Sequence, residues 1–300
     1  MHCMRSSLLF LTLHRLQRWC NPKLLLDAGA AEKRKTISLA SCLGTCWFST
    51  RSRAGRVVVV GDVHGCSDEL KDLLEASQFH PSLDELVFVG DLIGKGPSPE
   101  EVVRIARKYS AKAVQGNHEY NLLQWRKRGG ILPDPEGRIK ERYAATVKGL
   151  EEDEWDWLES LPLKLQLDLP QSPLPVMVVH AGLVPGVSIE QQEPENLVNL
   201  RSFDHEGRAS KQYDAGGGGW ARHWRGPMQV IFGHDARRGL QREPFAIGLD
   251  TGAVYGDELT ALLLPKNLDR SLAHLEPQHF AQVRARRAYA QKSDDLKSTQ

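Results

Sequence analysis

The stretch Val57-Val58-Val59-Val60-Gly61-Asp62-Val63-His64-Gly65 joins a short apolar run to a polar cluster. Four consecutive β-branched residues predict a buried strand, and Gly61 marks its end. Asp62 and His64 follow at once, at the point where a helix should begin. Open α/β folds bind their ligands at the carboxyl ends of the strands. The stretch therefore predicts an α/β fold with a polar site at one edge of a sheet.

The same arrangement of an apolar run followed by polar residues recurs four more times. The later segments are Leu86–Val89 before Gly90-Asp91, Ala113–Gln115 before Gly116-Asn117-His118-Glu119, Val178-Val179 before His180-Ala181-Gly182, and Val230–Phe232 before Gly233-His234-Asp235. Asp, Asn and His supply oxygen and imidazole ligands, which suit Mn, Fe or Zn ions. Five such segments that deliver ligands to one sheet edge indicate a hydrolase that uses two metal ions.

In this order, the motifs GD-x-HG, GD-x-x-G, GNHE, HAG and GH resemble those of the PPP family of metallophosphoesterases. The stretches Gly90–Pro97 and Gly248–Gly256, with Leu259–Leu262, are most similar to the ApaH-like branch, which resembles diadenosine tetraphosphatase. The resemblance covers residues 55 to 266. It implies a calcineurin-like αββα sandwich, in which two mixed β-sheets are flanked by helices.

The resemblance also implies a role for each motif residue. By it, Asp62 and His64 hold a first divalent ion, Asn117, His180 and His234 hold a second, and Asp91 bridges the two. Two such ions, expected to be Mn, Fe or Zn, provide an attacking hydroxide and neutralise charge on a phosphate. His118 is adjacent to a ligand, so we expect it to face the substrate and to act as the general acid.

The chain departs from the pattern of protein phosphatases at two adjacent positions. Those enzymes have Asp and Arg where this chain has Gly94 and Lys95. The usual carboxylate partner of the catalytic histidine is therefore absent, and Glu119 and Asp235 are alternatives by adjacency alone. Lys95 is expected to contact a substrate phosphate as a point charge, which favours a chain of phosphates over one tightly held phosphomonoester.

A second phosphate contact is expected from Arg201, which matches the region where related small phosphatases carry an arginine. Arg222 and Arg225 are alternatives to it, although each is as readily a surface arginine. Trp220 and Trp224, four residues apart, have the spacing to stack on a nucleobase. A pair of this kind packs into a core more often, and we favour that interpretation.

Composition and charge are those of an ordinary globular protein. The 300 residues are 41% hydrophobic and 26% charged, with a formal net charge of +1, so no global field attracts duplex DNA or a membrane. Of the five cysteines only Cys66 lies within the motif span, which leaves that span without an internal disulfide and fits a reducing compartment. No apolar run approaches the 18 or so residues of a membrane span. These features favour the cytoplasm.

The sequence divides into three parts. Residues 1–54 form an N-terminal extension that has no acidic residue before Asp27 and a basic, amphipathic start. Such a segment is typical of a mitochondrial or plastid transit peptide, and the alternatives are a disordered extension or a wrongly assigned start codon. Residues 55–268 form the catalytic domain. From Asp269 to residue 300 we expect a C-terminal helix that carries Leu272, Leu275, Phe280 and Val283, followed by a polar tail.

Within the catalytic domain, apolar spacing predicts helices and strands in alternation. Helices are expected at 68–76, 99–109, 118–128 and 151–161, and strands at 163–167, 176–179, 245–248 and 260–263. Gly216–Gly219 is a run of four glycines that no Gly-Lys-Ser/Thr follows, so it is not a P-loop. We expect it to be a flexible loop near the site.

Together these features predict a metal-dependent phosphatase. The substrate is expected to be a dinucleoside polyphosphate, a capped RNA end or inorganic polyphosphate, with a phosphoprotein as the alternative. A Ser/Thr protein phosphatase is disfavoured by Gly94 and Lys95. A pseudophosphatase that binds metal and acts as a scaffold is disfavoured because each expected ligand position holds a competent ligand. The sequence does not indicate an oligomeric state.

Overall fold

Two five-stranded sheets form the centre of the part of the chain that the structure, a computed structural model, describes: residues 55–130, 143–214 and 216–291. The first sheet has the order β12 (Phe280–Arg284), β11 (Glu258–Pro265), β1 (Arg56–Val60), β2 (Glu85–Phe88) and β3 (Lys112–Ala113). The second has the order β4 (Lys164–Gln166), β5 (Val176–Val179), β8 (Gln229–Phe232), β10 (Ala246–Gly248) and β9 (Gln241–Glu243). A small hairpin joins β6 (Ser202–Phe203) to β7 (Ala209–Ser210).

Both sheets are mixed, with a parallel centre. In the first, β1, β2 and β3 run parallel, whereas β11 is antiparallel to β1 and β12 is antiparallel to β11. In the second, β5, β8 and β10 run parallel between the antiparallel edge strands β4 and β9. Because parallel strands end at the same edge of a sheet, the residues that follow β1, β2 and β3 are brought together there.

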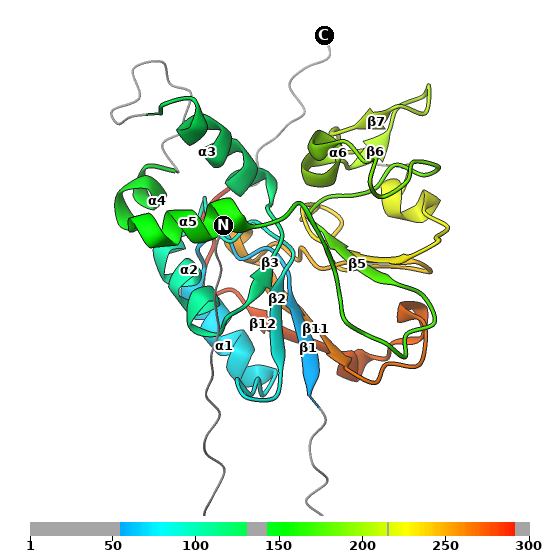
Figure 1. Ribbon diagram of the computed structural model, residues 1–300, viewed down its shortest axis with the longest axis horizontal. Coiled ribbons are helices and arrows are strands. Elements are labelled where there is room, and N and C mark those ends of the chain that lie inside the picture. Colours follow the sequence, from blue (N-terminus) through cyan, green and yellow to red (C-terminus); the bar gives the residue numbers. More distant parts are fainter. Residues whose placement is uncertain (1–54, 131–142, 215, 292–300) are drawn as a thin grey trace, which may run out of the picture. The chain divides into compact units, whose positions relative to one another are not determined.

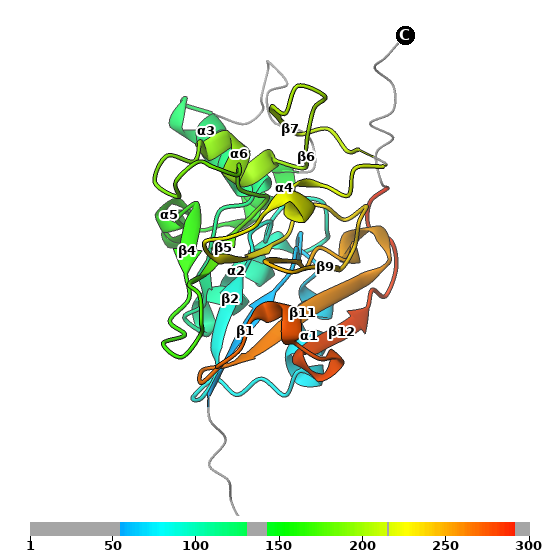
Figure 2. The same cartoon turned by 90° about the vertical axis from the view of Figure 1, so that its right-hand side faces the viewer.

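Helices cover the outer faces of the two sheets. The helices are α1 (Ser67–Ala76), α2 (Pro99–Lys108), α3 (Asn117–Lys127), α4 (Ala144–Gly149), α5 (Glu152–Ser160) and α6 (Pro194–Asn199), with 3₁₀ turns η2 (Trp220–His223), η3 (Ala253–Tyr255), η4 (Leu272–His274) and η5 (Pro277–His279). Figure 1 shows α1, α2, α4 and α5 on one side of the first sheet and β5 on its other side. Figure 2, turned by 90°, shows the second sheet in front of the first.

The alternation of side chains along β1 explains the layers. Val58 and Val60 pack with the helices of the first sheet, whereas Val57 and Val59 point into the space between the sheets. There they meet residues of the second sheet such as Val178. The outer face of the second sheet packs against α6 and η2 in a third cluster. The predicted α/β sandwich of two mixed sheets flanked by helices is thus confirmed.

The predicted C-terminal helix is wrong. The segment after Leu268 forms η4, η5 and β12, and β12 pairs with β11 as part of the first sheet. Leu272 and Leu275 are buried at a helical spacing, but Pro277 cannot continue a helix because it lacks an N–H and clashes with the preceding turn. The catalytic domain therefore extends beyond the boundary expected at residue 268.

The chain after β12 is fastened to α1. Arg286 pairs with Asp68 and Asp72, and its backbone N–H donates to Glu69. The hydroxyl of Tyr289 donates to the same Glu69 carboxylate at 2.8 Å.

The expected N-terminal extension, residues 1–54, lies outside the described residues. Among the residues that are described, no helix is both long and apolar enough to cross a membrane.

Candidate active site

The polar residues predicted as ligands meet where strands of the two sheets end. Asp62 and His64 follow β1, Asp91 follows β2, and Asn117 begins α3 just after β3. His180 and His234 follow β5 and β8 of the second sheet, at 0% and 7% exposure. The structure therefore brings all six predicted ligands to one place.

The backbone at this place is unusual. His64, Asp91 and His234 have φ angles of 49°, 50° and 70°, a left-handed conformation that non-glycine residues seldom adopt. Each such residue costs free energy, which is typical of sites where a side chain must point in one direction. Position 116, in contrast, requires a glycine, because a Cβ atom there would lie 2.1 Å from Asp91 Oδ1.

Four of the six side chains bring nitrogen or oxygen atoms that could bind a metal close to one another: His180, Asn117, His234 and Asp91. His180 Nε2 lies 3.1 Å from Asn117 Oδ1, 3.2 Å from His234 Nδ1 and 3.5 Å from Asp91 Oδ2. His180 Nδ1 lies 2.9 Å from the carbonyl oxygen of Val89, to which it donates its proton. The Nε2 lone pair of His180 therefore faces the oxygen atoms of Asn117 and Asp91, an arrangement that a cation would stabilise.

The donors around His64, here called the first group, approach the same Asp91 oxygen, Oδ2, as the donors around His180, the second group. His64 Nε2 lies 3.4 Å from Asp91 Oδ2, and His64 Nδ1 lies 3.2 Å from the carbonyl oxygen of Ile93. Donor atoms of His64, Asp91 and His118 all lie within 4.8 Å of one another. The carboxylate of Asp62, which follows β1, accepts the backbone N–H of His234 at 3.0 and 3.2 Å.

For the three histidines, burial favours the neutral form that a metal ligand requires. It lowers the pKa of the buried His64 to about 3, aided by the charge of Lys95, and it lowers the pKa of His180 and of His234 as well. Burial alone would raise the pKa of Asp91, but the neighbouring His180, His118 and His64 together hold it well below its ordinary value. Neutral imidazoles beside an ionised carboxylate are the forms that bind metal.

The donor set therefore fits divalent ions. Two groups of nitrogen and oxygen donors share Asp91, as the bridging role predicted for it requires. Two of the imidazoles are fixed by hydrogen bonds from Nδ1 to backbone carbonyls, which is the usual support of a metal-binding histidine. The identity of the metals stays a prediction.

Packing and a backbone hydrogen bond help to hold His118. Its N–H donates to Asp91 Oδ1 at 3.0 Å, and its ring lies edge-on to His64 and Tyr143, with centroids 4.6 and 5.3 Å apart. A Cβ atom on Gly94 would lie 2.2 Å from His118 Nδ1. The glycine that replaces the aspartate of protein phosphatases thus gives the imidazole its space.

Neither of the two carboxylates suggested as partners of His118 serves in that role. Glu119 accepts hydrogen bonds from the backbone N–H groups of Asp91, Ile93 and Gly116, at 2.8, 3.0 and 2.8 Å. It therefore ties the loop after β2 to the start of α3. Burial, followed by the charge of Asp91, raises the pKa of Glu119 to about 8. Asp235 forms an ion pair with Arg238 instead.

Lys95 and a residue without a predicted role lie beside the first group of donors. Lys95 Nζ donates to His64 Nε2 at 2.9 Å and lies 5.1 Å from the ring centroid of Tyr255. Asp250 is buried beside Asp62, and burial raises its pKa to about 6. Sequence reasoning gave Asp250 no role, although it follows an apolar strand, β10, as the predicted ligands do.

Of the three candidate arginines, Arg201 is the one that contacts a ligand segment. Its Nη2 donates to the carbonyl oxygen of His234 at 3.4 Å, and its charge helps to lower the pKa of that imidazole after burial. Arg225 instead donates to the backbone carbonyl of Trp224 at 3.0 Å. Trp220 and Trp224 are only 2% and 3% exposed, which confirms that they belong to the core.

The predicted proximity of the glycine run to the site is also confirmed. Gly219 approaches Arg201 and Arg238 so closely that a Cβ atom would lie 3.3 Å from the carbonyl oxygen of the first and 3.1 Å from Nε of the second.

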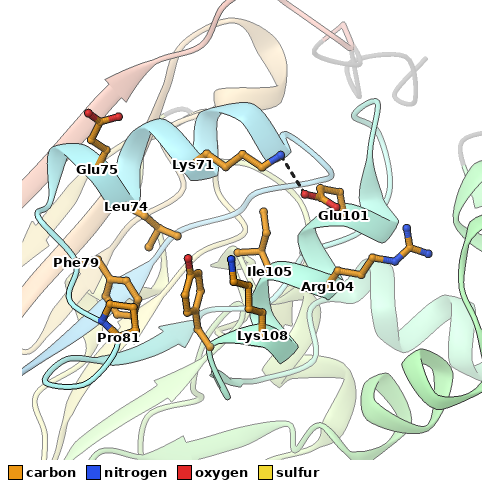
Figure 3. A pocket seen from close by; sticks show the side chains of 10 residues that line it. Lys71, Leu74, Glu75, Phe79, Pro81, Glu101, Arg104, Ile105 and Lys108 are labelled. Atoms are coloured by element: carbon orange, nitrogen blue, oxygen red, sulfur yellow. Dashed lines mark ion pairs between the residues drawn. The ribbon is translucent and has the colours of Figure 1, made fainter.

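A separate hollow of about 640 Å³ lies between α1 and α2 (Figure 3). Apolar side chains such as Leu74, Phe79 and Ile105 line it, and Lys71 pairs with Glu101 across its upper rim at 3.0 Å. None of the six predicted metal ligands lines this hollow, so it is not part of the site.

Comparison with known proteins agrees with this geometry. The symmetrical bis(5'-nucleosyl)-tetraphosphatase of Psychromonas ingrahamii is 37% identical over 153 residues, which are 48% of this chain and 52% of that protein. The chain thus spans about half the length of this relative. The asymmetrical bis(5'-nucleosyl)-tetraphosphatase PrpE of Oceanobacillus iheyensis is 25% identical over 251 residues, 74% of this chain and 94% of that protein.

A solved structure, provisionally named a diadenosine tetraphosphatase, superimposes with a TM-score of 0.63 at 35% identity. The superposition covers 78% of this chain and 95% of that structure. The sequence pattern of the calcineurin-like phosphoesterases matches residues 55–264, which include every predicted ligand. The chain belongs to the calcineurin-like phosphoesterases, and it is a metal-dependent phosphatase.

Proposed function

We propose that the chain hydrolyses phosphoanhydride bonds in substrates that carry several linked phosphates, and that dinucleoside polyphosphates are the favoured class. The observation that carries this proposal is the presence of a cation on each side of the donor cluster. Lys95 Nζ lies 2.9 Å from His64, and Arg201 lies 3.4 Å from the carbonyl oxygen of His234. A chain of phosphates can place one negatively charged group near each cation, whereas a phosphomonoester has a single phosphate for both.

The glycine at position 94 supports the same substrate class. An aspartate there would add negative charge beside the reacting phosphate and would repel a second or third phosphate. Gly94 removes that charge, and His118 occupies the space. The names of the two tetraphosphatase relatives also favour a nucleotide-linked chain of phosphates.

The reaction needs water, a phosphorus atom and a leaving oxygen in line. The oxygen of water forms a bond to phosphorus while the bond from phosphorus to the bridging oxygen breaks. When bound, two divalent ions supply an activated water and neutralise charge on the phosphate. His118 donates a proton to the leaving oxygen. Lys95 and Arg201 hold the phosphates on either side of the bond that breaks.

A substrate panel tests the proposal. The protein with Mn²⁺ is offered diadenosine tetraphosphate, inorganic tripolyphosphate, a capped RNA oligonucleotide and a phosphothreonine peptide. We expect the highest kcat/KM on diadenosine tetraphosphate. Its products distinguish symmetrical cleavage, which yields two ADP, from asymmetrical cleavage, which yields ATP and AMP. The fastest turnover on the phosphopeptide would overturn the proposal in favour of a protein phosphatase.

The role of His118 has its own test. His118→Asn should lower turnover of an alkyl phosphate by about 10²–10⁴-fold, the usual loss for a missing general acid, while the metal content stays unchanged. Turnover of p-nitrophenyl phosphate should fall much less, because its leaving group is acidic enough to depart without a proton. Equal losses on the two substrates would show that His118 is not the proton donor.

A further inference from the structure

An exposed aromatic ring stands on the rim of the site beside the second group of donors. Tyr213 is 37% exposed, and within the described ranges only Leu83 is another large hydrophobic side chain with comparable exposure. Tyr213 lies in the segment between β7 and the glycine run, which also approaches Arg201 and Arg238.

The ring is held in place, although it is exposed. The guanidinium carbon of Arg238 lies 4.5 Å from the ring centroid of Tyr213, and Nη2 of the same arginine donates to the carbonyl oxygen of Asp214 at 2.7 Å. Arg238 also forms ion pairs with the carboxylates of Asp214 and Asp235. Its side chain is 10% exposed, so these contacts are largely shielded from water.

These contacts tie the ring to a predicted metal ligand. Asp235 directly follows His234, so a single guanidinium links the segment after β8 to Tyr213. Two contacts and one peptide bond thus separate the ring from His234.

The chemistry of this rim suits the base of a nucleotide. Nucleobases stack on aromatic rings and on guanidinium planes, and guanidinium groups also pair with phosphates. The guanidinium of Arg237, an exposed residue, lies 5.3 Å from the ring centroid of Tyr213. One ring and two guanidinium groups therefore stand together near the segment that carries His234.

We infer that Tyr213, with Arg237 and Arg238, forms a nucleobase subsite for the part of the substrate that extends past the second group of donors. This inference rests on the proposed function, since it names the residues that would distinguish a nucleotide-linked polyphosphate from an inorganic one. The subsite contributes to binding and not to the reacting atoms.

The test separates base binding from phosphate binding. The ligands are α,β-methylene-ADP, which resists hydrolysis at its bridge, and methylenediphosphonate, which has the same bridged phosphates without the nucleoside. Calorimetric titration of the full chain with Mn²⁺ should show tighter binding of the nucleotide. Tyr213→Ala should weaken its Kd about 5- to 150-fold, the loss expected for one stacked base, and leave the Kd of methylenediphosphonate unchanged. Tyr213→Phe should retain nucleotide binding.

A matched control removes Leu83, the other exposed large hydrophobic side chain of the described residues. Leu83→Ala should change neither Kd, and the thermal unfolding midpoint of each variant shows whether the fold is intact. Equal binding of the two ligands by the unchanged protein, or equal weakening of both in Tyr213→Ala, would overturn the subsite. Base-dependent binding without turnover of diadenosine tetraphosphate would leave the subsite standing and reject the proposed function.

Discussion

Where the first sheet enters the site, buried hydrogen bonds hold the polar loops, whereas on the side of the second sheet the rim of the site consists of exposed segments. Glu119, at 0% exposure, accepts from three backbone N–H groups and so fixes the loop that carries Asp91. On the other side, Tyr213 stands in a segment that leads into the glycine run, and an arginine connects it to the ligand segment.

This difference suggests a division of tasks. Groups that take part in bond breaking must keep their geometry within a fraction of an ångström, and a buried scaffold provides this. Groups that select a substrate need only contact it, so loops can carry them. Changes to the buried residues that hold the ligands should therefore lower the rate on every substrate, and changes to groups that contact the substrate should alter the ratio between substrates.

The largest effect is expected from the shared carboxylate. Asp91→Asn removes the negative charge that both groups of donors share, so turnover should fall by orders of magnitude and metal content should fall with it. Elemental analysis of the purified variant measures the metal, and the substrate panel measures the rates. Two metals per chain with unchanged turnover would show that Asp91 does not bridge.

The next effect concerns the contact between Gly94 and His118. Gly94→Asp restores the residue of protein phosphatases, but its Cβ atom would lie 2.2 Å from His118 Nδ1, at a backbone φ of +111°. As for the loss of a general acid, we expect a loss of about 10²–10⁴-fold on substrates whose leaving group needs a proton, a smaller loss on p-nitrophenyl phosphate, and no gain on phosphopeptides.

A matched control for this variant is Gly186→Asp. Gly186 also has a positive φ, of +79°, but nothing lies within 4 Å of the added Cβ atom. This control carries the backbone strain without the collision, so its kcat should stay near that of the unchanged protein. Phosphopeptide hydrolysis by Gly94→Asp would mean that the imidazole moves and accepts a carboxylate partner.

A smaller and selective effect is expected from Lys95. Lys95→Ala removes one of the two cations that flank the cluster, so kcat/KM should fall more for tripolyphosphate and diadenosine tetraphosphate than for p-nitrophenyl phosphate. The expected difference between the substrate classes is about 5- to 30-fold, from the 1–2 kcal/mol of one charge-assisted contact. An equal loss on all substrates would show that Lys95 supports the chemical step and does not select for a chain of phosphates.

The smallest effect on activity is expected at the other end of β1. There Arg56 donates to Asp84 at 2.6 Å, and although burial would raise the pKa of Asp84, the hydrogen bonds from Arg56 and His80 lower it. A lowered pKa in the folded state adds stability above the ordinary value, and this stability is lost as the pH falls through the folded value.

Asp84→Asn should therefore lower the free energy of unfolding at pH 7 by about 1–3 kcal/mol and leave kcat unchanged below the melting temperature. Denaturant titrations from pH 7 to pH 3 measure the difference between the two proteins, which should shrink as the pH falls. A constant difference across this range would show that the Asp84 charge does not contribute to stability.

Sequence patterns were sufficient to predict those features of the site that depend on neighbouring residues along the chain. The end of an apolar strand places the next polar residue at the sheet edge, so Asp62, His64 and Asp91 could be found in this way. The role of Glu119 could not, because its partners Asp91 and Ile93 lie 28 and 26 residues away. The position of Glu119 next to His118 in the sequence does not indicate where the Glu119 side chain points.

The error at the C-terminus has a similar cause. Leu272 and Leu275 are spaced as in a helix, but pairing with β11, a contact between distant residues, decides the structure of the segment around Phe280. Tyr213 gave no signal in the sequence, since an exposed tyrosine in a polar segment has no periodicity.

The last strand of the first sheet has a consequence for solubility. β12 covers one edge of β11, an eight-residue strand with the apolar sequence Leu259 to Leu264 interrupted only by Thr260. A chain that stops at Leu268 would leave that edge open, and an unpaired apolar edge recruits strands from other molecules. Such a truncated chain should aggregate during refolding even though it retains every predicted metal ligand.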